Sequence, residues 1–514
     1  MNSTRRTSTE PRLALNEIQG NVLPGFRKDR QRFQFFKLVD SASARPWLQG
    51  LHGRISSASE VFRAHVAWKK AKRRLGREPV EIDFYFMNAA LSAHALRQLT
   101  SNEEVESFTD DAFKVGLAPR SAFIRDTAKL GEPGHVSTWV VGGLTKPVDL
   151  LLISASDNNS LVEGHAQELR GEAEANGFTH VWTDVGDVHR APAPGHEHFG
   201  FRDGISDPAL RGRRPKPPHE FVYPRTLPPG REFAGLRREF ASPSKRLVWP
   251  GNFLFGYPRQ DQDDPTKGNP ADTPRGPGWS TNGSFLVFRR LRQDVKKLKT
   301  FADEAAASLR AKLSDDTIDA EKLLALLVGR WPSGTPVIRS PHRDTMLSED
   351  ARNYFGYDGP LGPALPGDPQ PPGIPDPNGV IVPLAAHIRK VNPRNEPTDL
   401  GSAFRTPSRL ILRRGITYAE SEDDHGLLFV AYQSSIMNQF EFLMTNWIHN
   451  PNRPRSDGGH DPILVQSPGG EVVLRHQGRE EVLRVPGGWV IPTGGEYFFA
   501  PPIAFFRERM ARTE

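Results

Sequence analysis

Alternating apolar and polar positions predict strands and helices that follow one another through the first half of the chain. Strands are expected where apolar residues alternate or run together, at residues 31–39, 82–86, 148–154 and 178–185. Helices are expected at residues 44–55 and 159–176. In the second helix, Leu161, His165 and Leu169 recur at helical spacing, and Gly177 follows as a stop signal.

The second half shows the same succession of strands and helices. Strands are expected at residues 284–289, 409–416, 427–433 and 489–500, and helices at residues 293–313, 320–327 and 435–447. Residues 356–379 are rich in Pro and Gly and lack periodic apolar positions, so they predict a long irregular loop. Two similar α+β halves follow from this pattern.

Length and composition agree with two domains. A chain of 514 residues exceeds what one hydrophobic core usually fills. Hydrophobic residues at 37% and charged residues at 25% are typical of a soluble globular protein. The 46 Gly and 46 Pro predict extensive irregular connections between the regular elements.

Charge and hydropathy argue against two classes of partner. The net charge of +6 is small for this size, and no arginine-rich block is interleaved with aromatics, so we expect no nucleic acid. No apolar run approaches the length of a membrane span. Arg5 and Arg6 suggest an export signal, but residues 7–12 are polar. We therefore expect a disordered arm at residues 1–15 and a cytoplasmic protein.

A carboxylate stands between two glycines near the middle of the chain. Gly200 and Gly204 allow Asp203 to be presented on a tight turn, although an ordinary Asp–Gly turn is the simpler local interpretation. Further along, His387 and Arg413 supply a histidine and an arginine. One Asp, one His and one Arg are side chains that suit a haem peroxidase.

The absence of cysteine narrows the kinds of iron site. It excludes disulfides, thiolate-ligated haem, iron–sulfur clusters and covalent CxxCH haem attachment. Histidine is then the natural iron ligand if haem is bound.

Several motifs resemble one known family, the dye-decolorizing peroxidases. The chain has a GxxDG element at 200–204, an HxRKxNPR element at 387–394 and an arginine–glycine strand at 413–415. Other family-like stretches lie at residues 19–23, 329–334, 426–429 and 495–501. Each motif is weak alone, but together they run in order over most of the chain.

The resemblance implies a fold and a domain arrangement. It implies an α+β protein with two ferredoxin-like domains, whose antiparallel sheets are flanked by helices. We place the first domain at residues 16–235, with the GxxDG motif near its end, and the second, haem-binding domain at residues 236–514. The pattern of apolar residues alone does not specify this topology.

The resemblance also implies a reaction. It implies one haem b per chain and the use of hydrogen peroxide to oxidise dyes, phenols or similar aromatic reductants. His387 would be the proximal ligand of the haem iron. Asp203 would move the proton of peroxide and Arg413 would stabilise negative charge on its oxygen. Because adjacent strand residues face opposite sides, Arg414 would point away from the site.

Further residues receive roles from the same resemblance. Arg389, Asn392 and Arg394 would contact the haem propionates, although structural salt bridges would explain them as well. Leu427 and Phe429 would line the distal side, a position that strand core residues could equally share.

Two more side chains are candidates on weaker grounds. Tyr418 lies five residues past Arg413, where relatives can carry a redox-active surface tyrosine, so it is a candidate electron relay to bulky dyes. Its flanking residues differ from the IPYG pattern of the family. Glu441, on the helix expected at 435–447, could accept a hydrogen bond from His387 or could be a solvated helix residue.

Two other functions stay open. His196, His198 and Asp203 could supply two histidines and a carboxylate to a non-haem iron oxygenase. A haem carrier or storage protein could use His387 without turnover, but it would need neither Asp203 nor Arg413. The sequence does not specify the physiological reductant, a manganese site, the oligomeric state or enclosure by a shell protein.

Overall fold

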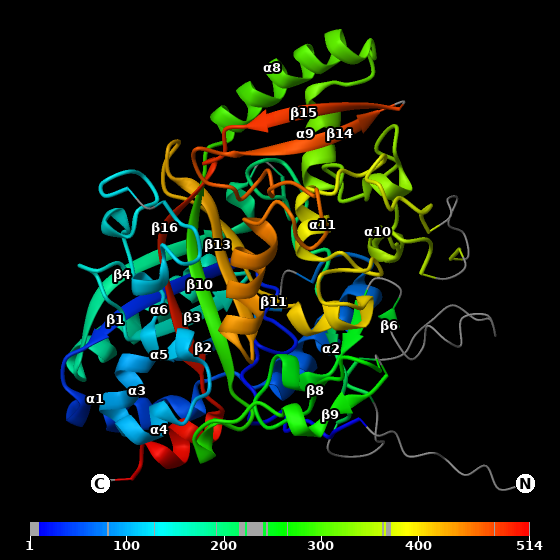
Figure 1. Ribbon diagram of the computed structural model, residues 1–514. Helices are drawn as coiled ribbons and strands as arrows, with labels where there is room; N and C mark the ends of the chain where they lie inside the picture. The colour runs from blue at the N-terminus through cyan, green and yellow to red at the C-terminus, as the bar shows by residue number, and fades with distance from the viewer. Residues whose placement is uncertain are drawn as a thin grey trace, which may run out of the picture.

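The computed structural model shows how the two halves join (Figure 1). It describes residues 10–79, 82–127, 129–191, 193–214, 221–223, 240–242, 245–264, 266–361, 364–365, 372–476 and 478–512. Within these ranges, no helix combines the length and the apolar character needed to cross a membrane.

The first half contains a four-stranded antiparallel sheet in the order β4-β1-β3-β2. Its strands are β1 (Arg30–Leu38), β2 (Phe86–Ser92), β3 (Leu150–Ser156) and β4 (Phe178–Asp187). Its main helices are α1 (Ser41–Gly50), α2 (Ala58–Leu75) and α6 (Asn159–Ala175), with α3 (Ala93–Leu99), α4 (Asn102–Glu106) and α5 (Asp111–Val115) between β2 and β3. A βαββαβ chain with this strand order is ferredoxin-like.

The second half repeats this arrangement, with the strand order β16-β10-β13-β12. Its strands are β10 (Ser284–Gln293), β12 (Ile416–Ala419), β13 (His425–Gln433) and β16 (Val490–Ala500), and β11 (Leu412–Arg413) also pairs with β13. Its helices are α8 (Val295–Leu313), α9 (Ala320–Val328), α10 (Glu349–Asn353), α11 (His387–Val391) and two π-helices at Ile436–Phe440 and Leu443–Ile448.

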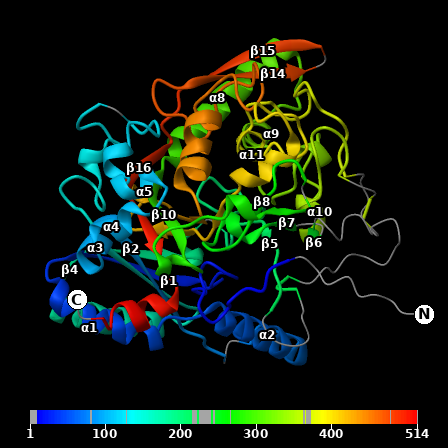
Figure 2. The same cartoon turned by 60° about the horizontal axis from the view of Figure 1, so that its bottom comes forward.

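Shorter strands complete the described structure. They are β5 (Ala209–Leu210), β6 (Phe240–Ser242), β7 (Lys245–Val248), β8 (Arg259–Gln260), β9 (Gly268–Asn269) and the hairpin β14 (Gly470–His476) with β15 (Arg479–Val485). This hairpin and α8 lie at the opposite end of the molecule from α1, as both views show (Figure 1, Figure 2).

The two sheets close into one barrel. β16 pairs with β2, β12 pairs with β4 at Tyr418 and Gly186, and β10 pairs with β13, so eight strands form a ring. Aromatic rings from both halves meet inside it; the centroids of Phe35 and Phe288 are 4.7 Å apart. The predicted α+β fold with two ferredoxin-like antiparallel sheets is confirmed.

Several predicted boundaries need correction. The strand expected at 82–86 begins only at Phe86, and the one expected at 409–416 is two short strands, β11 and β12. Gly415 separates them, and a Cβ there would lie 2.8 Å from the carbonyl oxygen of Leu428, so the chain passes close to β13 at this point. The helix expected at 435–447 is π-helical.

The disordered arm expected at residues 1–15 does not hold for its last six residues. Residues 1–9 lie outside the described residues, but residues 10–15, which we expected to be disordered, are packed against the protein. Leu13 is buried, and its amide donates to the carbonyl of Arg213 at 3.0 Å. The domain boundary expected between residues 235 and 236 falls outside the described residues and stays a prediction.

Candidate active site

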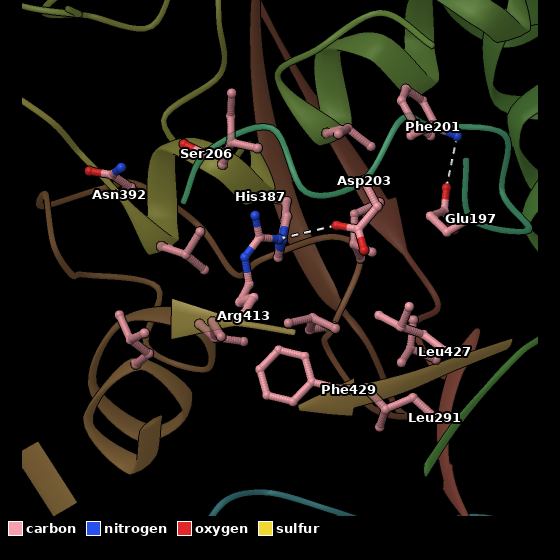
Figure 3. Close-up of a pocket in the computed structure, with 18 of the residues that line it drawn as sticks. Glu197, Phe201, Asp203, Ser206, Leu291, His387, Asn392, Arg413, Leu427 and Phe429 are labelled. Atoms are coloured by element: carbon pink, nitrogen blue, oxygen red, sulfur yellow. Dashed lines mark hydrogen bonds and ion pairs between the residues drawn. The ribbon is translucent and has the colours of Figure 1, made fainter. Parts of the chain in front are cut away.

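One cavity of about 320 Å³ collects residues from distant parts of the chain. Asp203 comes from the loop after β4, His387 from the start of α11 and Arg413 from β11 (Figure 3). Leu427 and Phe429 line it from β13, while the intervening Leu428 faces the barrel interior. Asn392 and Arg394 line it as well. Seven residues expected at the site therefore share one cavity.

Asp203 and Arg413 face each other across this cavity. Nη1 of Arg413 donates to Oδ1 of Asp203 at 3.3 Å (Figure 3). Gly200 and Gly204 have φ values of 98° and 71°, which favour glycine, and the Gly204 amide donates to the same carboxylate. Burial alone would lower the pKa of Arg413, but the charges of Asp207 and Asp203 raise it. The arginine is therefore a fixed cation beside the carboxylate.

Arg414 points away from the cavity, as strand alternation predicts. Its Nε donates to the carbonyl of Asn21 at 2.9 Å and its Nη2 to that of Val22 at 3.0 Å. Its guanidinium thus ties β11 to the N-terminal segment. Arg413 is the arginine of this pair that lines the cavity.

His387 is held by a carboxylate that the sequence did not reveal. Its Nδ1 lies 2.7 Å from Oδ2 of Asp461, which is fully buried. The amides of Ile463 and Leu464 donate to the other oxygen of Asp461. Burial alone would raise the pKa of Asp461, but the nearby His387 and these amides lower it. The described part of the chain offers Nε2 of His387 no hydrogen-bond partner, so this nitrogen is left to bind a ligand.

Two arginines at the cavity have no carboxylate partner among the described residues. Arg330 donates to the carbonyls of Gly334 and Arg352, and Arg394 to that of Asn353. Burial and the charge of Arg394 lower the pKa of Arg330 to about 9, and burial lowers that of Arg394 to about 10. Nε of Arg394 is buried without a partner. The part of the cavity lined by Arg330 and Arg394 therefore favours the binding of an anionic group.

Two family models match most of the chain. The "DyP dimeric alpha+beta barrel domain" matches residues 17–189, and "Dyp-type peroxidase, C-terminal" matches residues 258–457. The chain belongs to the dye-decolorizing peroxidase family. It is a peroxidase, and the family is haem-dependent.

Known relatives align along nearly the whole of this peroxidase. It is 28% identical to dye-decolorizing peroxidase msp1 of Mycetinis scorodonius, over 97% of this chain and 88% of that enzyme. A solved ancestral D-type dye-decolorizing peroxidase has a TM-score of 0.75 and 29% identity, covering 98% of this chain and 100% of that chain. Another, solved with 2,6-dimethoxyphenol, has a TM-score of 0.73 and 27% identity, covering 97% and 100%.

Arg389 is not part of the cavity of this peroxidase. Its guanidinium is buried and is bound by the carboxylates of Glu396 and Asp376 and by the carbonyl of Val382. The propionate contact expected for Arg389 is therefore wrong, because its donors already serve these acceptors. Arg330, which belongs to the glycine–arginine–tryptophan turn of the family, lines the cavity instead. The family resemblance includes this turn, but the sequence alone assigns no role to its arginine.

Glu441 does not contact His387. Its two oxygens accept from Nε and Nη2 of Arg120, both at 2.6 Å, and one also accepts from the hydroxyl of Tyr497 at 3.0 Å. Asp461, and not Glu441, is the carboxylate that accepts the hydrogen bond from His387. It lies in a turn 74 residues after His387, and no motif spacing links the two.

Tyr418 is buried, so the surface position expected for it is wrong. It is 0% exposed and lies inside the barrel. Its hydroxyl donates to Oδ1 of Asp424 at 3.0 Å, and the guanidinium of Arg290 lies 4.2 Å from the ring centroid. Burial raises the pKa of this hydroxyl well above its ordinary value.

The non-haem iron alternative gains no support from these positions. Nε2 of His198 donates to the carbonyl of Tyr418 at 2.9 Å, away from Asp203. Across the described ranges, no group of three or more His, Asp or Glu side chains could hold a metal ion.

Proposed function

We propose that this peroxidase holds one haem b per chain in the cavity, where His387 would bind the iron and Asp203 and Arg413 would act on peroxide. The observation that carries the proposal is that these three residues, far apart in sequence, line one cavity. A haem carrier would need His387 but not the Asp203–Arg413 pair, so the pair favours turnover over carriage.

The residues of the cavity fit haem. The carboxylates of its two propionates would balance Arg330 and Arg394, which have no carboxylate partner in the described ranges, with Asn392 nearby as a further donor. Leu427 and Phe429 present an apolar wall suited to a flat macrocycle. The free Nε2 of His387 is the ligand atom that such a cofactor requires.

The bound haem would supply the redox equivalents that reduce peroxide. Asp203 would accept the proton from one peroxide oxygen and return it to the other, which is general acid–base catalysis. The fixed charge of Arg413 would orient the Asp203 carboxylate and stabilise negative charge on the leaving oxygen. Leu427 and Phe429 would exclude water.

On the other side, Asp461 would set the properties of His387. Its hydrogen bond to Nδ1 fixes the tautomer, so that Nε2 carries the free lone pair. A buried carboxylate in this position also makes the imidazole a stronger electron donor. Asp461 would therefore orient the ligand and tune the iron.

We propose dyes and phenols as the reductants. A relative was solved with 2,6-dimethoxyphenol, an aromatic of this class. Bulky dyes would deliver electrons from outside the cavity, and Tyr418, being buried, could act only as an internal step of that transfer. The cytoplasmic location expected from the sequence stays a prediction.

Haem reconstitution tests this proposal. The purified protein should bind haem with a strong Soret band that changes on addition of peroxide. Absence of a Soret band would exclude haem function in this cavity. A band unresponsive to peroxide would favour the carrier.

A further inference from the structure

A second carboxylate lines the distal side of the cavity. Glu197 lies six residues before Asp203 on the same loop, and both side chains line the cavity (Figure 3). The amide of Phe199 donates to Oε2 of Glu197 at 2.9 Å, and the amide of Phe201 to Oε1 at 2.8 Å. Gln293 of β10 also donates to Oε2. Nothing in the peroxide chemistry described above uses this group.

The loop holds the two carboxylates in a fixed relation. The amide of Asp203 donates to the carbonyl of Gly195 at 3.0 Å, and the amide of Glu197 to that of Phe201 at 2.9 Å. These bonds close a hairpin around Glu197. The Gln293 contact fastens this hairpin to the barrel wall.

The residue after Glu197, His198, is largely buried but borders a second hollow on the other side of the loop. His198 and His425 line a surface hollow together with Lys296, Lys299 and Asp303 of α8, and the two imidazole rings are 4.7 Å apart. Gln293 connects the two sides, because its Oε1 accepts from the amide of His198 at 3.4 Å while its amide nitrogen donates to Glu197.

Strand geometry places the hollow directly beyond the cavity. Leu427 of β13 lines the cavity and His425, two residues earlier on the same face, lines the hollow. On β10, Leu291 and Gln293 line the cavity, and Val295, just past the strand, lines the hollow. The Glu197–Gln293 pair thus lies between the two.

The stoichiometry of peroxide reduction requires a supply of protons. Hydrogen peroxide, two electrons and two protons give two molecules of water. Asp203 returns to one oxygen the proton it took from the other, so it adds none. When the electrons come from a reductant too bulky to enter the cavity, the two protons must reach the cavity by a route of their own.

We propose that Glu197 is the proton-entry residue of the distal side, taking protons from the hollow at His198 and His425 and passing them to Asp203 during the reduction steps. This inference rests on the proposed function. Each transfer moves one proton from the hollow to the Glu197 carboxylate, and from there through Asp203 to the oxygen being reduced to water. The electrons come from the aromatic reductant.

The electrostatics of Glu197 suit this role. Burial raises the pKa of Glu197 to about 7, the charge of Asp203 acts in the same direction, and the donors from Phe199, Gln293 and Phe201 oppose it. At neutral pH both protonation states are therefore populated. The other charged or titratable groups that line the cavity are Asp126, Arg202, Arg289, Arg330, His387, Arg394 and Arg413, and those that line the hollow are His198, His425, Lys296, Lys299 and Asp303.

The chain offers a matched control. Burial also raises the pKa of Glu496 to about 7, and this carboxylate likewise accepts from two backbone amides, those of Leu117 and Tyr497. Glu496 does not line the cavity. Glu197→Gln and Glu496→Gln therefore remove similar carboxyl groups from different places.

The first measurement needs no turnover. Infrared spectra of the resting full-length protein, titrated across neutral pH, should show a carboxylic acid band that Glu197→Gln removes and Glu496→Gln leaves in place. If the spectra of Glu197→Gln and the wild type are identical, Glu197 does not titrate and the proposal fails.

The second measurement separates the two halves of the reaction by stopped flow. In Glu197→Gln, the first reaction with peroxide should stay within about twofold of wild type, while dye-driven reduction slows about tenfold or more with a larger solvent deuterium effect. Glu197→Asp keeps a titratable carboxyl and should recover part of this loss, and Glu496→Gln should show none.

Three outcomes would count against the idea. Equal loss in both half-reactions would make Glu197 only an anchor of the Asp203 loop. Equal rates in Glu197→Gln and Glu197→Asp would show that the titratable proton is irrelevant. A wild-type protein that binds haem but never reacts with peroxide would overturn the proposed function itself, whatever Glu197 does.

Discussion

The Nδ1 atom of His387 lies 2.7 Å from a carboxylate oxygen of Asp461, which is buried 74 residues further along the chain. The same short helix, α11, also secures the segment that leads to Asp461. Nζ of Lys390 donates to the carbonyls of Asn450 and Gly459 at 2.8 and 2.7 Å. The proposed iron ligand and the chain that orients it are therefore fastened together.

His387→Ala should abolish tight haem binding, because no thiol is present and His387 is the histidine that lines the cavity. The Soret absorbance per protein after reconstitution measures this. Unchanged absorbance and an unchanged iron spectrum would remove His387 from the ligand role.

Asp461→Asn should weaken haem binding about tenfold or more, since losing the partner of a ligating histidine typically costs 10–100-fold in affinity. The midpoint potential of the iron should also rise, because the imidazole donates fewer electrons. His460→Gln, at the neighbouring position, is the control. Potentiometry showing the same potential in Asp461→Asn and wild type would contradict the assignment.

Asp203→Asn should slow the first reaction with peroxide by about 10²–10⁴-fold, the usual contribution of a positioned acid–base group. Arg413→Leu should slow it by about 10²–10³-fold. Because both act on one transition state, the double variant should lose much less than the product of the two effects. Stopped-flow rates at several peroxide concentrations measure this coupling.

Arg414→Leu is the control for this pair, since Arg414 is bound to the carbonyls of Asn21 and Val22. It should react with peroxide at nearly the wild-type rate, although with some loss of stability. If Arg414→Leu is inactive while Arg413→Leu is not, the catalytic arginine has been assigned one residue too early.

Tyr418→Phe should destabilise the protein by about 1 kcal/mol, because Asp424 loses a partly buried hydrogen bond. We also expect slower oxidation of a large anthraquinone dye, since Asp424 is placed to accept the hydroxyl proton if the ring passes on an electron. The first reaction with peroxide should be unchanged. Equal dye rates in variant and wild type would leave Tyr418 with a purely structural role.

Short motifs allowed part of the site to be predicted from the sequence. The two glycines predicted the turn around Asp203. Strand alternation allows only one of Arg413 and Arg414 to face the site, and the family resemblance, with its arginine two residues before the glycine, selected Arg413. The strand β12 is buried on both faces at Ile416, Thr417 and Tyr418, so alternation along the sequence does not distinguish a surface tyrosine from a buried one.

Other features depend on contacts that leave no local pattern. Asp461 reaches His387 only because tertiary contacts such as those of Lys390 shape the irregular segment before it. Barrel closure between β4 and β12 rests on a single pairing of Tyr418 with Gly186. Arg389 and Arg394 belong to the same motif, but their side chains have different surroundings. Arg389 forms ion pairs with the buried Asp376 and Glu396, whereas Arg394 lines the cavity.

His65 makes the folded protein less stable in acid. Burial lowers the pKa of His65 to about 4, and the charges of Arg27, Lys28 and Lys69 act in the same direction. Below the ordinary histidine pKa of about 6.5, His65 is protonated in the unfolded chain, but in the folded protein it stays neutral down to about pH 4. The free energy of unfolding therefore falls as the pH drops through this window.

His65 should therefore cost about 1 kcal/mol of stability between pH 7.5 and pH 5, after allowance for its partial exposure. Thermal unfolding at both pH values checks this, and His65→Gln should shrink the drop in melting temperature because glutamine takes up no proton in either state. His52→Gln, which changes an exposed histidine, should leave the drop unchanged. If both variants lose as much stability as wild type on acidification, groups other than His65 cause the loss of stability. Changing His65 would then not extend dye oxidation to more acidic pH.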